Sequence, residues 1–335
     1  GISFYTFQSM SYTIDVYRGQ LRPTNHLGLF ALYVSFFPQL VAGPIERAGN
    51  LLPQFRAPRP FDAERAASGL QLVLRGLLKK LLIADNLGTF VDPVFLNLPA
   101  NGPATLTLAS LAFAFQIYCD FSGYSDIAIG VARILGYDLM DNFRRPYMAT
   151  SIPEFWRRWH ISLSTWFRDY VYVSLGGNRV SPSRLRWNLF IVFALSGLWH
   201  GANWTFIIWG AFHGLLIIAW VGLSGVRLPL APWVSRMLGV AVTCLLVCVG
   251  WIFFRARNVN DAWYVIGHVG SIDAWTLNEI VTTVDRLSPP VRVAFAACAI
   301  MTAWHVVEEL RGPASVWLNA PRPARWLVYQ AGVVA

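Results

Sequence analysis

The sequence predicts an all-α integral membrane protein with several membrane helices. Of its 335 residues, 55% are hydrophobic and only 13% are charged, whereas soluble domains carry about 25% charged residues. The mean hydropathy is +0.45, and long uncharged runs recur along the chain. So few charges cannot cover a water-facing surface, so most of the exterior must face an apolar medium.

The basic residues are clustered, and their placement argues against nucleic acid as a partner. The formal net charge is +9. Residues 43–80 and 141–186 together hold 15 of the 27 basic residues and six acidic ones. These two stretches lie between apolar segments. Clustered Arg and Lys beside membrane spans are typical of cytoplasmic loops, so both stretches are expected to face the cytoplasm.

The clearest membrane segment is 187–226, which contains no Asp, Glu, Lys or Arg. As a helix it would be ~60 Å long, enough for two crossings of a ~30 Å hydrocarbon core. A break is expected at 201–203, because Gly201 can end the first helix and Asn203 can cap the second.

Shorter uncharged runs extend this pattern over the whole chain. Together with 187–226 they predict six to eight membrane helices within one polytopic domain, 1–335. The runs are 23–45, 93–119, 237–254 and 293–305. Because the chain opens on Gly1 and 326–335 resembles a shortened span, we expect a fragment that lacks N-terminal spans and possibly C-terminal ones.

Two segments depart from simple spans. Residues 61–90 place Leu and Val on one face with Arg75, Lys79 and Lys80 beside it, which predicts an amphipathic helix at the membrane interface. Residues 151–175 begin with a Ser151 cap and mix three Trp with Arg and Asp, a composition suited to the headgroup region.

Two of the six histidines are candidates for chemistry. His200 lies within the long uncharged run, where an ionisable group is costly and by default marks a functional site; the alternative is a hydrogen bond between helices. His160 follows Arg157 and Arg158, whose charges disfavour its protonation; the alternative is an interfacial role. For His213, flanked by small residues, a structural hydrogen bond is expected.

The acidic and sulfur-containing residues predict structure rather than chemistry. Asp120 and Asp126 follow an apolar run and are expected to accept hydrogen bonds from Arg or Tyr elsewhere. The four cysteines show no metal-ligand spacing and are expected to be reduced and buried. No GxSxG, HExxH or Walker motif is present, and we predict no bound metal or cofactor.

Three long runs resemble the membrane-bound O-acyltransferase family, and more narrowly its bacterial branch of alginate O-acetylation membrane proteins. They are FFPQLVAGPIER (36–47), the stretch from YCDFSGYSD to SLGGNR (118–179) and the stretch from WNLF to FHGL (187–215). The resemblance implies a multi-pass protein of the bacterial inner membrane. Its fold would be a ring of tilted helices, with re-entrant or interfacial helices, around a central tunnel.

The same resemblance implies the site. The active histidine of the family corresponds to His200, and its second histidine to His160. The implied reaction moves an acetyl group from a cytoplasmic thioester, acetyl-CoA or an acyl carrier protein, for O-acetylation of an exopolysaccharide such as alginate. A periplasmic acetyltransferase, the polysaccharide acceptor and membrane lipid are the expected partners.

Acyl transfer needs a base or nucleophile, stabilisation of an oxyanion and exclusion of water. His200 could serve as either base or nucleophile, Trp199 and Trp204 could keep the site dry, and Asn203 could bind the oxyanion or only cap its helix. Basic residues near His160 could bind donor phosphates, although each also fits the positive-inside bias. The predicted substrate-binding residues are Arg157, Arg158, Trp156, Trp199, Asn203 and Trp204; the wider arginine group adds Arg144, Arg145 and Arg168.

Two other functions remain open on the residues alone. Intramembrane His and Asp also occur in transporters and flippases, as parts of proton relays. A non-catalytic scaffold that recruits a periplasmic acetyltransferase is the third reading.

Overall fold

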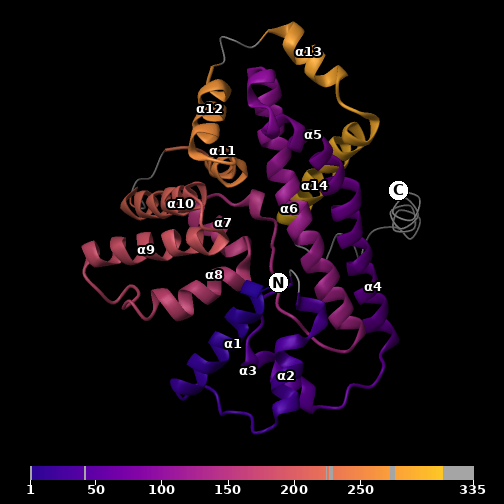
Figure 1. The fold of residues 1–335 in the computed structure, drawn as a ribbon, viewed down its shortest axis with the longest axis vertical. Coiled ribbons are helices and arrows are strands. Elements are labelled where there is room, and N and C mark those ends of the chain that lie inside the picture. Colours follow the sequence, from indigo (N-terminus) through magenta and orange to yellow (C-terminus); the bar gives the residue numbers. More distant parts are fainter. Residues whose placement is uncertain (1, 41–42, 224, 226–228, 272–275, 312–335) are drawn as a thin grey trace. The chain divides into compact units, whose positions relative to one another are not determined.

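The computed structural model describes residues 2–40, 43–223, 225, 229–271 and 276–311, and every regular element among them is a helix (Figure 1). This confirms the all-α class. The shortened span predicted at 326–335 lies outside the described residues.

Four helices of the described chain are long and apolar enough to cross a membrane. They are α6 (Pro103–Ile134), α10 (Trp204–Leu223), α11 (Pro232–Arg255) and α14 (Pro289–Arg311). A shorter apolar stretch covers Leu27–Gln39. The sequence predicted six to eight, and α9 (Pro182–His200) is one that falls short, because its first turns are polar and carry Arg184 and Arg186.

The chain divides into two compact units. The first comprises Gly1–Lys80, Phe121–Arg144 and Trp156–Gly176, and the second Leu81–Asp120, Arg145–Phe155 and Gly177–Ala335. Each is described by itself below, and the single domain expected for 1–335 stays a prediction.

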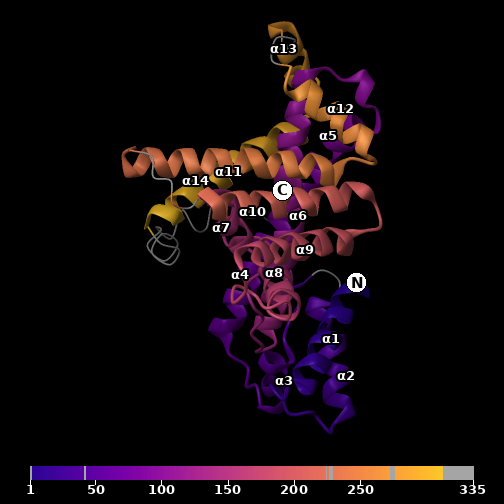
Figure 2. The ribbon, with the colours of Figure 1, turned by 90° about the vertical axis from the view of Figure 1, so that its left-hand side faces the viewer.

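In the first unit, α1 (Ile2–Tyr17), α2 (Leu27–Ser35) and α3 (Ala48–Arg56) pack together (Figures 1 and 2). The short helix η1 (Phe37–Gln39) follows α2. Their apolar core includes the C-terminal part of α6, and its buried members are Tyr33, Phe36, Ala48, Leu51, Leu52, Ile129, Ala132 and Leu139. The Tyr33 hydroxyl donates to the backbone oxygen of Glu46 at 3.0 Å, which holds the chain entering α3 against α2.

The predicted amphipathic segment is helical throughout and packs on α6. It consists of α4 (Ala63–Leu77), a π-helical turn η2 (Leu78–Ala84) and α5 (Asp85–Leu96), and begins at an Asp62 cap. Gly69 faces Gly130, and Gly76 faces Gly123. A Cβ on Gly69 would lie 2.6 Å from the Gly130 oxygen, so close approach of the backbones requires glycine there. An interfacial position for this segment stays a prediction.

In the second unit, α9 and α10 form a hairpin, and α11 packs against α10 (Figures 1 and 2). The helix α12 (Val259–Val269) contacts α11, and α14 packs against α5 and η4 (Pro146–Met148). The remaining elements are η3 (Leu98–Ala100) and α13 (Leu277–Asp285). The hairpin and α11 carry the site described next.

The helix start predicted at Ser151 is confirmed. Ser151 Oγ accepts from the backbone nitrogen of Glu154 at 3.4 Å, and the Glu154 carboxylate accepts from the nitrogen of Thr150 at 2.8 Å. Ser151 thus caps the helix, and Glu154 reaches back to the residue before the cap, which resembles a capping box without being fully reciprocal. It begins α7 (Ile152–Arg158), followed by α8 (Ile161–Phe167) and the π-helical η5 (Arg168–Tyr172).

Candidate active site

His200 is the last residue of α9, at the break that the sequence predicts. The helix ends at Gly201, and α10 begins at Trp204. Asn203 Oδ1 accepts from the backbone nitrogen of Thr205 at 3.1 Å, and its Nδ2 donates to the oxygen of Arg257 at 3.0 Å. Both ends of the Asn203 amide are thus used in capping α10 and tying the turn to the chain after α11.

Four aromatic rings surround the partly buried imidazole of His200. Trp199 and Trp209 lie 4.9 and 5.1 Å from it between ring centroids, both edge to face. Phe254, from α11, lies 5.1 Å away, and Phe206 lies 6.3 Å away. We call these four residues the aromatic cage. Such an environment limits the contact of water with the imidazole.

The cage depends on close packing between α9 and α10. Gly197 and Gly210 face each other at the crossing, and a Cβ on Gly197 would lie 2.2 Å from the oxygen of Phe206. A Cβ on Gly201 would lie 2.8 Å from Cε2 of Phe206. Glycine at these positions lets Phe206 and Trp209 approach the end of α9.

His213 lies one helical turn after Trp209 on α10 and is fully buried. Its ring packs on Trp209 at 5.2 Å, and a Cβ on Gly250 would lie 2.7 Å from its Nε2. This close packing between α10 and α11 is in keeping with a structural role, while the predicted hydrogen bond stays a prediction.

Behind the cage, Tyr147 fixes a tryptophan of α11. The Tyr147 hydroxyl accepts from Trp251 Nε1 at 3.1 Å and donates to the backbone oxygen of Ala114 at 2.5 Å. Trp251 in turn packs on Trp209 and Phe254, with centroid distances of 5.9 and 5.5 Å. This support joins η4, α6, α10 and α11.

His160 belongs to the first unit and sits at the break between α7 and α8. Its side chain is buried, and its φ of 42° places a non-glycine residue in the left-handed region. Phe121 packs edge to face at 4.5 Å, and Phe4 stacks at 6.2 Å. Asn142 fixes the following backbone, since its oxygen accepts from Ile161 at 3.0 Å and its Oδ1 from Ser162 at 3.2 Å.

The predicted arginine group is not uniform. Arg145, in the second unit, pairs with Glu308 and Glu309 at 3.3 and 3.0 Å. In the first unit, Arg144 pairs with Asp141 at 3.0 Å and Arg168 with Asp169 at 2.7 Å. Arg157 is exposed and Arg158 half-buried, whereas Trp156 is buried in the first unit.

Trp204 stands apart from the other predicted residues near His200. It is 70% exposed at the start of α10, and among the described residues it makes no ring contact with His200. Phe206, Trp209 and Phe254 take the wall positions, and sequence reasoning missed all three. Two of them could have been considered from the sequence, because Phe206 and Trp209 lie within one to two turns of Trp204 on the same predicted helix.

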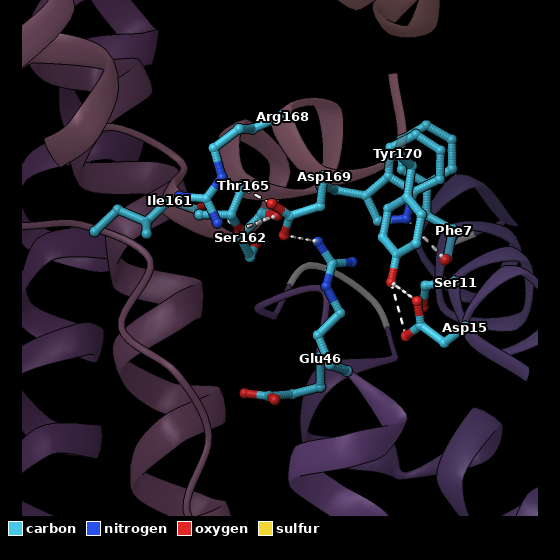
Figure 3. Close-up of polar contacts among 12 residues, drawn as sticks. Phe7, Ser11, Asp15, Glu46, Ile161, Ser162, Thr165, Arg168, Asp169 and Tyr170 are labelled. Atoms are coloured by element: carbon cyan, nitrogen blue, oxygen red, sulfur yellow. Dashed lines mark hydrogen bonds and ion pairs between the residues drawn. The ribbon is translucent and has the colours of Figure 1, made fainter. Parts of the chain in front are cut away.

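The first unit also contains a polar pocket that the sequence did not predict, and Figure 3 shows the polar contacts of its lining residues Asp15, Asp169 and Tyr170. It is lined by Asp15, Arg18, Gln20, Arg47, Asp169, Tyr170 and Val173. The Tyr170 hydroxyl donates to Asp15 at 2.8 Å, and the Arg47 guanidinium lies 4.8 Å from the centre of the Tyr170 ring. Burial, together with that hydrogen bond to Asp15, raises the pKa of Tyr170. Two Arg and two Asp give this lining a formal charge of zero.

Asp126 accepts from Arg75 at 3.0 Å and from Lys79 at 2.8 Å, which confirms the predicted pairing with arginine. All four cysteines are free, and three of them are buried. Within the described ranges, no group of three His, Cys, Asp or Glu side chains could hold a metal ion.

Comparison with known proteins places this chain in a family. Residues 20–254 match the membrane-bound O-acyltransferase family. The chain belongs to this family. The match includes both candidate histidines and every member of the aromatic cage, of which Phe254 is the last matched residue.

The relatives of this chain carry different acceptors in their names. It is 48% identical over 84% of its length to the probable alginate O-acetylase AlgI of Azotobacter vinelandii, and equally so to that of Pseudomonas aeruginosa. It is 38% identical over 80% of its length to the peptidoglycan O-acetyltransferase of Helicobacter pylori.

The chain spans about half the length of these curated relatives. The matched part covers 55% of the Azotobacter protein, 53% of the Pseudomonas protein and 56% of the Helicobacter protein. The family match and the apolar helices establish the family and a multi-pass membrane fold. Because the chain covers only part of its relatives, the activity of the whole protein is a proposal.

Proposed function

We propose that the full-length protein is an O-acyltransferase of the bacterial inner membrane. It takes an acetyl group from a cytoplasmic thioester and passes it on for O-acetylation of an exopolysaccharide. The observation that carries this proposal is the imidazole of His200 inside the aromatic cage, within a segment that matches an acyltransferase family.

In the proposed reaction, His200 acts as a general base on the acceptor hydroxyl. The hydroxyl oxygen attacks the thioester carbonyl, and its proton passes to the imidazole. The new C–O bond forms as the C–S bond breaks, and the imidazolium returns the proton to the leaving thiolate. The aromatic cage supports this role because a dry site protects the thioester from hydrolysis and strengthens electrostatic interactions.

The donor is proposed to enter from the cytoplasmic side, where thioesters are made. Arg157 and Arg158 are the best candidates for its phosphates, whether these belong to acetyl-CoA or to the phosphopantetheine arm of a carrier protein. Both lie within three residues of His160 in the sequence, and Arg157 is exposed. Arg144, Arg145 and Arg168 pair with carboxylates of their own units.

His160 is proposed to help position the donor rather than to carry the transfer. Its left-handed backbone supports this, since non-glycine residues in that region cost about 1–3 kcal/mol and cluster at functional sites.

Replacing His160 by Ala should slow transfer by about 10² to 10⁴, the range for lost positioning or proton transfer. Replacing it by Gly should slow transfer equally but leave the protein more stable than the Ala variant. Equal stability of the two variants would contradict the inferred backbone strain.

The names of the relatives support a polysaccharide acceptor. The names of the first relatives specify alginate, and that of the Helicobacter protein peptidoglycan. We propose an exopolysaccharide acceptor such as alginate, reached directly or through a periplasmic acetyltransferase.

The test uses the full-length protein in proteoliposomes, with radiolabelled acetyl-CoA and acetyl carrier protein in separate arms and the exopolysaccharide of the source cell as acceptor. Wild type should transfer label, and His200→Ala should not. His268→Ala is the matched control, because His268 is a half-buried histidine of the second unit that stacks on Tyr264; it should retain activity.

The same experiment separates the two other functions. Wild-type acetylation by a folded His200→Ala protein would leave a scaffold role and refute the proposed base. Substrate-coupled ion flux without label transfer from either donor would replace the proposal with a transporter.

A further inference from the structure

We infer that the aromatic cage restricts the donor to short acyl groups, and that Phe254 is the residue that sets this limit. The inference rests on the proposed function, and it adds the acyl length that the site accepts. The inference requires that aromatic rings with no part in the acyl-transfer chemistry fill the space beside the His200 imidazole.

The rings fill the space beside the imidazole on more than one side. Trp209 and Phe254 both lie 5.1 Å from its centroid, and they lie 5.3 Å from each other. Phe206 lies 5.0 Å from Phe254 and 6.3 Å from the imidazole. Centroid separations of this size leave no layer of atoms between neighbouring rings.

Phe254 lies at the centre of this arrangement. It contacts His200, Phe206 and Trp209, and it also packs edge to face on Trp251 at 5.5 Å. Trp209 and Trp251 are buried, whereas Phe254 is only partly buried. Shortening Phe254 therefore opens space that adjoins both the imidazole and the surface of the unit, where an acyl chain could enter.

The chemistry of the transfer makes this space decisive. When the thioester carbonyl lies at the imidazole, an acetyl group places one methyl group beside it, and a longer acyl group places methylenes where the Phe254 ring lies. Packed interiors accept extra methylenes poorly. A methylene in an apolar pocket changes specificity by about 10- to 200-fold, so two extra methylenes should exclude butyryl from the wild-type site.

The proposal is tested with the full-length protein and two donors, acetyl-CoA and butyryl-CoA, by comparing transfer rates. Wild type should prefer acetyl by at least about 100-fold, and Phe254→Ala should reduce that preference to about 10-fold or less by accepting butyryl. Phe254→Leu, a milder change, should give an intermediate preference.

Phe253→Ala is the matched control. Phe253 is the preceding residue of α11, and its ring packs on Trp263 at 5.5 Å. It should leave the acetyl preference unchanged, although loss of a buried ring lowers stability.

The outcomes separate this inference from the proposed function. No transfer of either acyl group by wild type would refute the proposed function. Wild-type transfer of both at similar rates would refute the length limit alone. Transfer of acetyl by Phe254→Leu or Phe254→Ala with the wild-type preference would refute the role of Phe254. If Phe254→Ala does not fold, the wild-type ratio and Phe254→Leu still decide.

Discussion

Single glycines determine how closely the rings approach His200. Gly201 is the clearest case, because the space beside its Cα is occupied by the Phe206 ring. A methyl group there must displace that ring, and Phe206 is a member of the aromatic cage. The residue that follows the candidate base thus shapes the site without carrying a functional group.

We therefore expect Gly201→Ala to reduce acyl transfer by about 10-fold or more while the protein still folds, since small misplacements in an active site cost up to about 10² in rate. Gly222→Ala is the control: Gly222 lies on α10 with nothing within 4 Å of the added methyl. Transfer rates and thermal unfolding of both variants in detergent would check this. Undiminished transfer by folded Gly201→Ala would show that Phe206 has no part in the site.

At the level of single residues, the sequence was informative where local chemistry decides. The break at Gly201, the cap at Asn203 and the cap at Ser151 all involve residues within a few positions of one another. Phe254 could not be predicted, because 54 residues separate it from His200 and only the packing of α11 on α10 brings it there. The pocket around Arg47 and Tyr170 was missed for the same reason.

Among the elements, the contact between α4 and α6 is defined by backbone approach and by one ion cluster. The two facing glycine pairs are spaced by seven residues on each helix, so a shift of one residue would press a side chain against backbone. Asp126 lies between the two glycines of α6 and is shared by Arg75 and Lys79. The apolar face of 61–90 was visible in the sequence, but its glycines gave no sign of their partners.

We expect Asp126→Asn to destabilise the first unit by about 3–5 kcal/mol, because it removes the carboxylate that pairs at 2.8 Å with Lys79, whose side chain is only 12% exposed. The double variant Lys79→Met with Asp126→Leu should recover much of that loss. The free energy of unfolding in detergent is the measurement.

Asp138→Asn is the control for this substitution. Asp138 also pairs with a basic residue of α4, Arg65, but it is 63% exposed. An exposed pair is worth about 0–1 kcal/mol. A loss for Asp126→Asn no greater than for Asp138→Asn would mean that burial of the cluster adds nothing.

For the molecule as a whole, composition and charge predicted most of what the structure and the comparisons support. The apolar helices of the structure and the family match both indicate a multi-pass membrane protein, as the apolar composition and the basic loops predicted. The number of spans was less predictable. The uncharged run that begins at Trp187 covers only the later part of α9, and the first turns of this helix are polar. The ring and tunnel expected from the family depend on placing the two units and stay predictions.

Orientation can be tested with one cysteine. Asn178 is exposed in the loop before α9 and lies within the basic stretch 141–186. Because such stretches stay in the cytoplasm, a cysteine at Asn178 should react with an impermeant maleimide only after the membrane is permeabilised. Labelling of intact cells would place the loop outside and reverse the proposed side of donor entry.

The cluster around Asp126 also bears on how the protein is made. A carboxylate in the middle of an apolar helix costs about 2.5–3.5 kcal/mol on insertion if it enters alone. Arg75 lies 51 residues earlier in the chain, so during synthesis both cations emerge before Asp126 reaches the translocon. Asp126 can therefore pair with Arg75 and Lys79 as α6 enters the bilayer, so that the order of residues along the chain becomes an order of assembly.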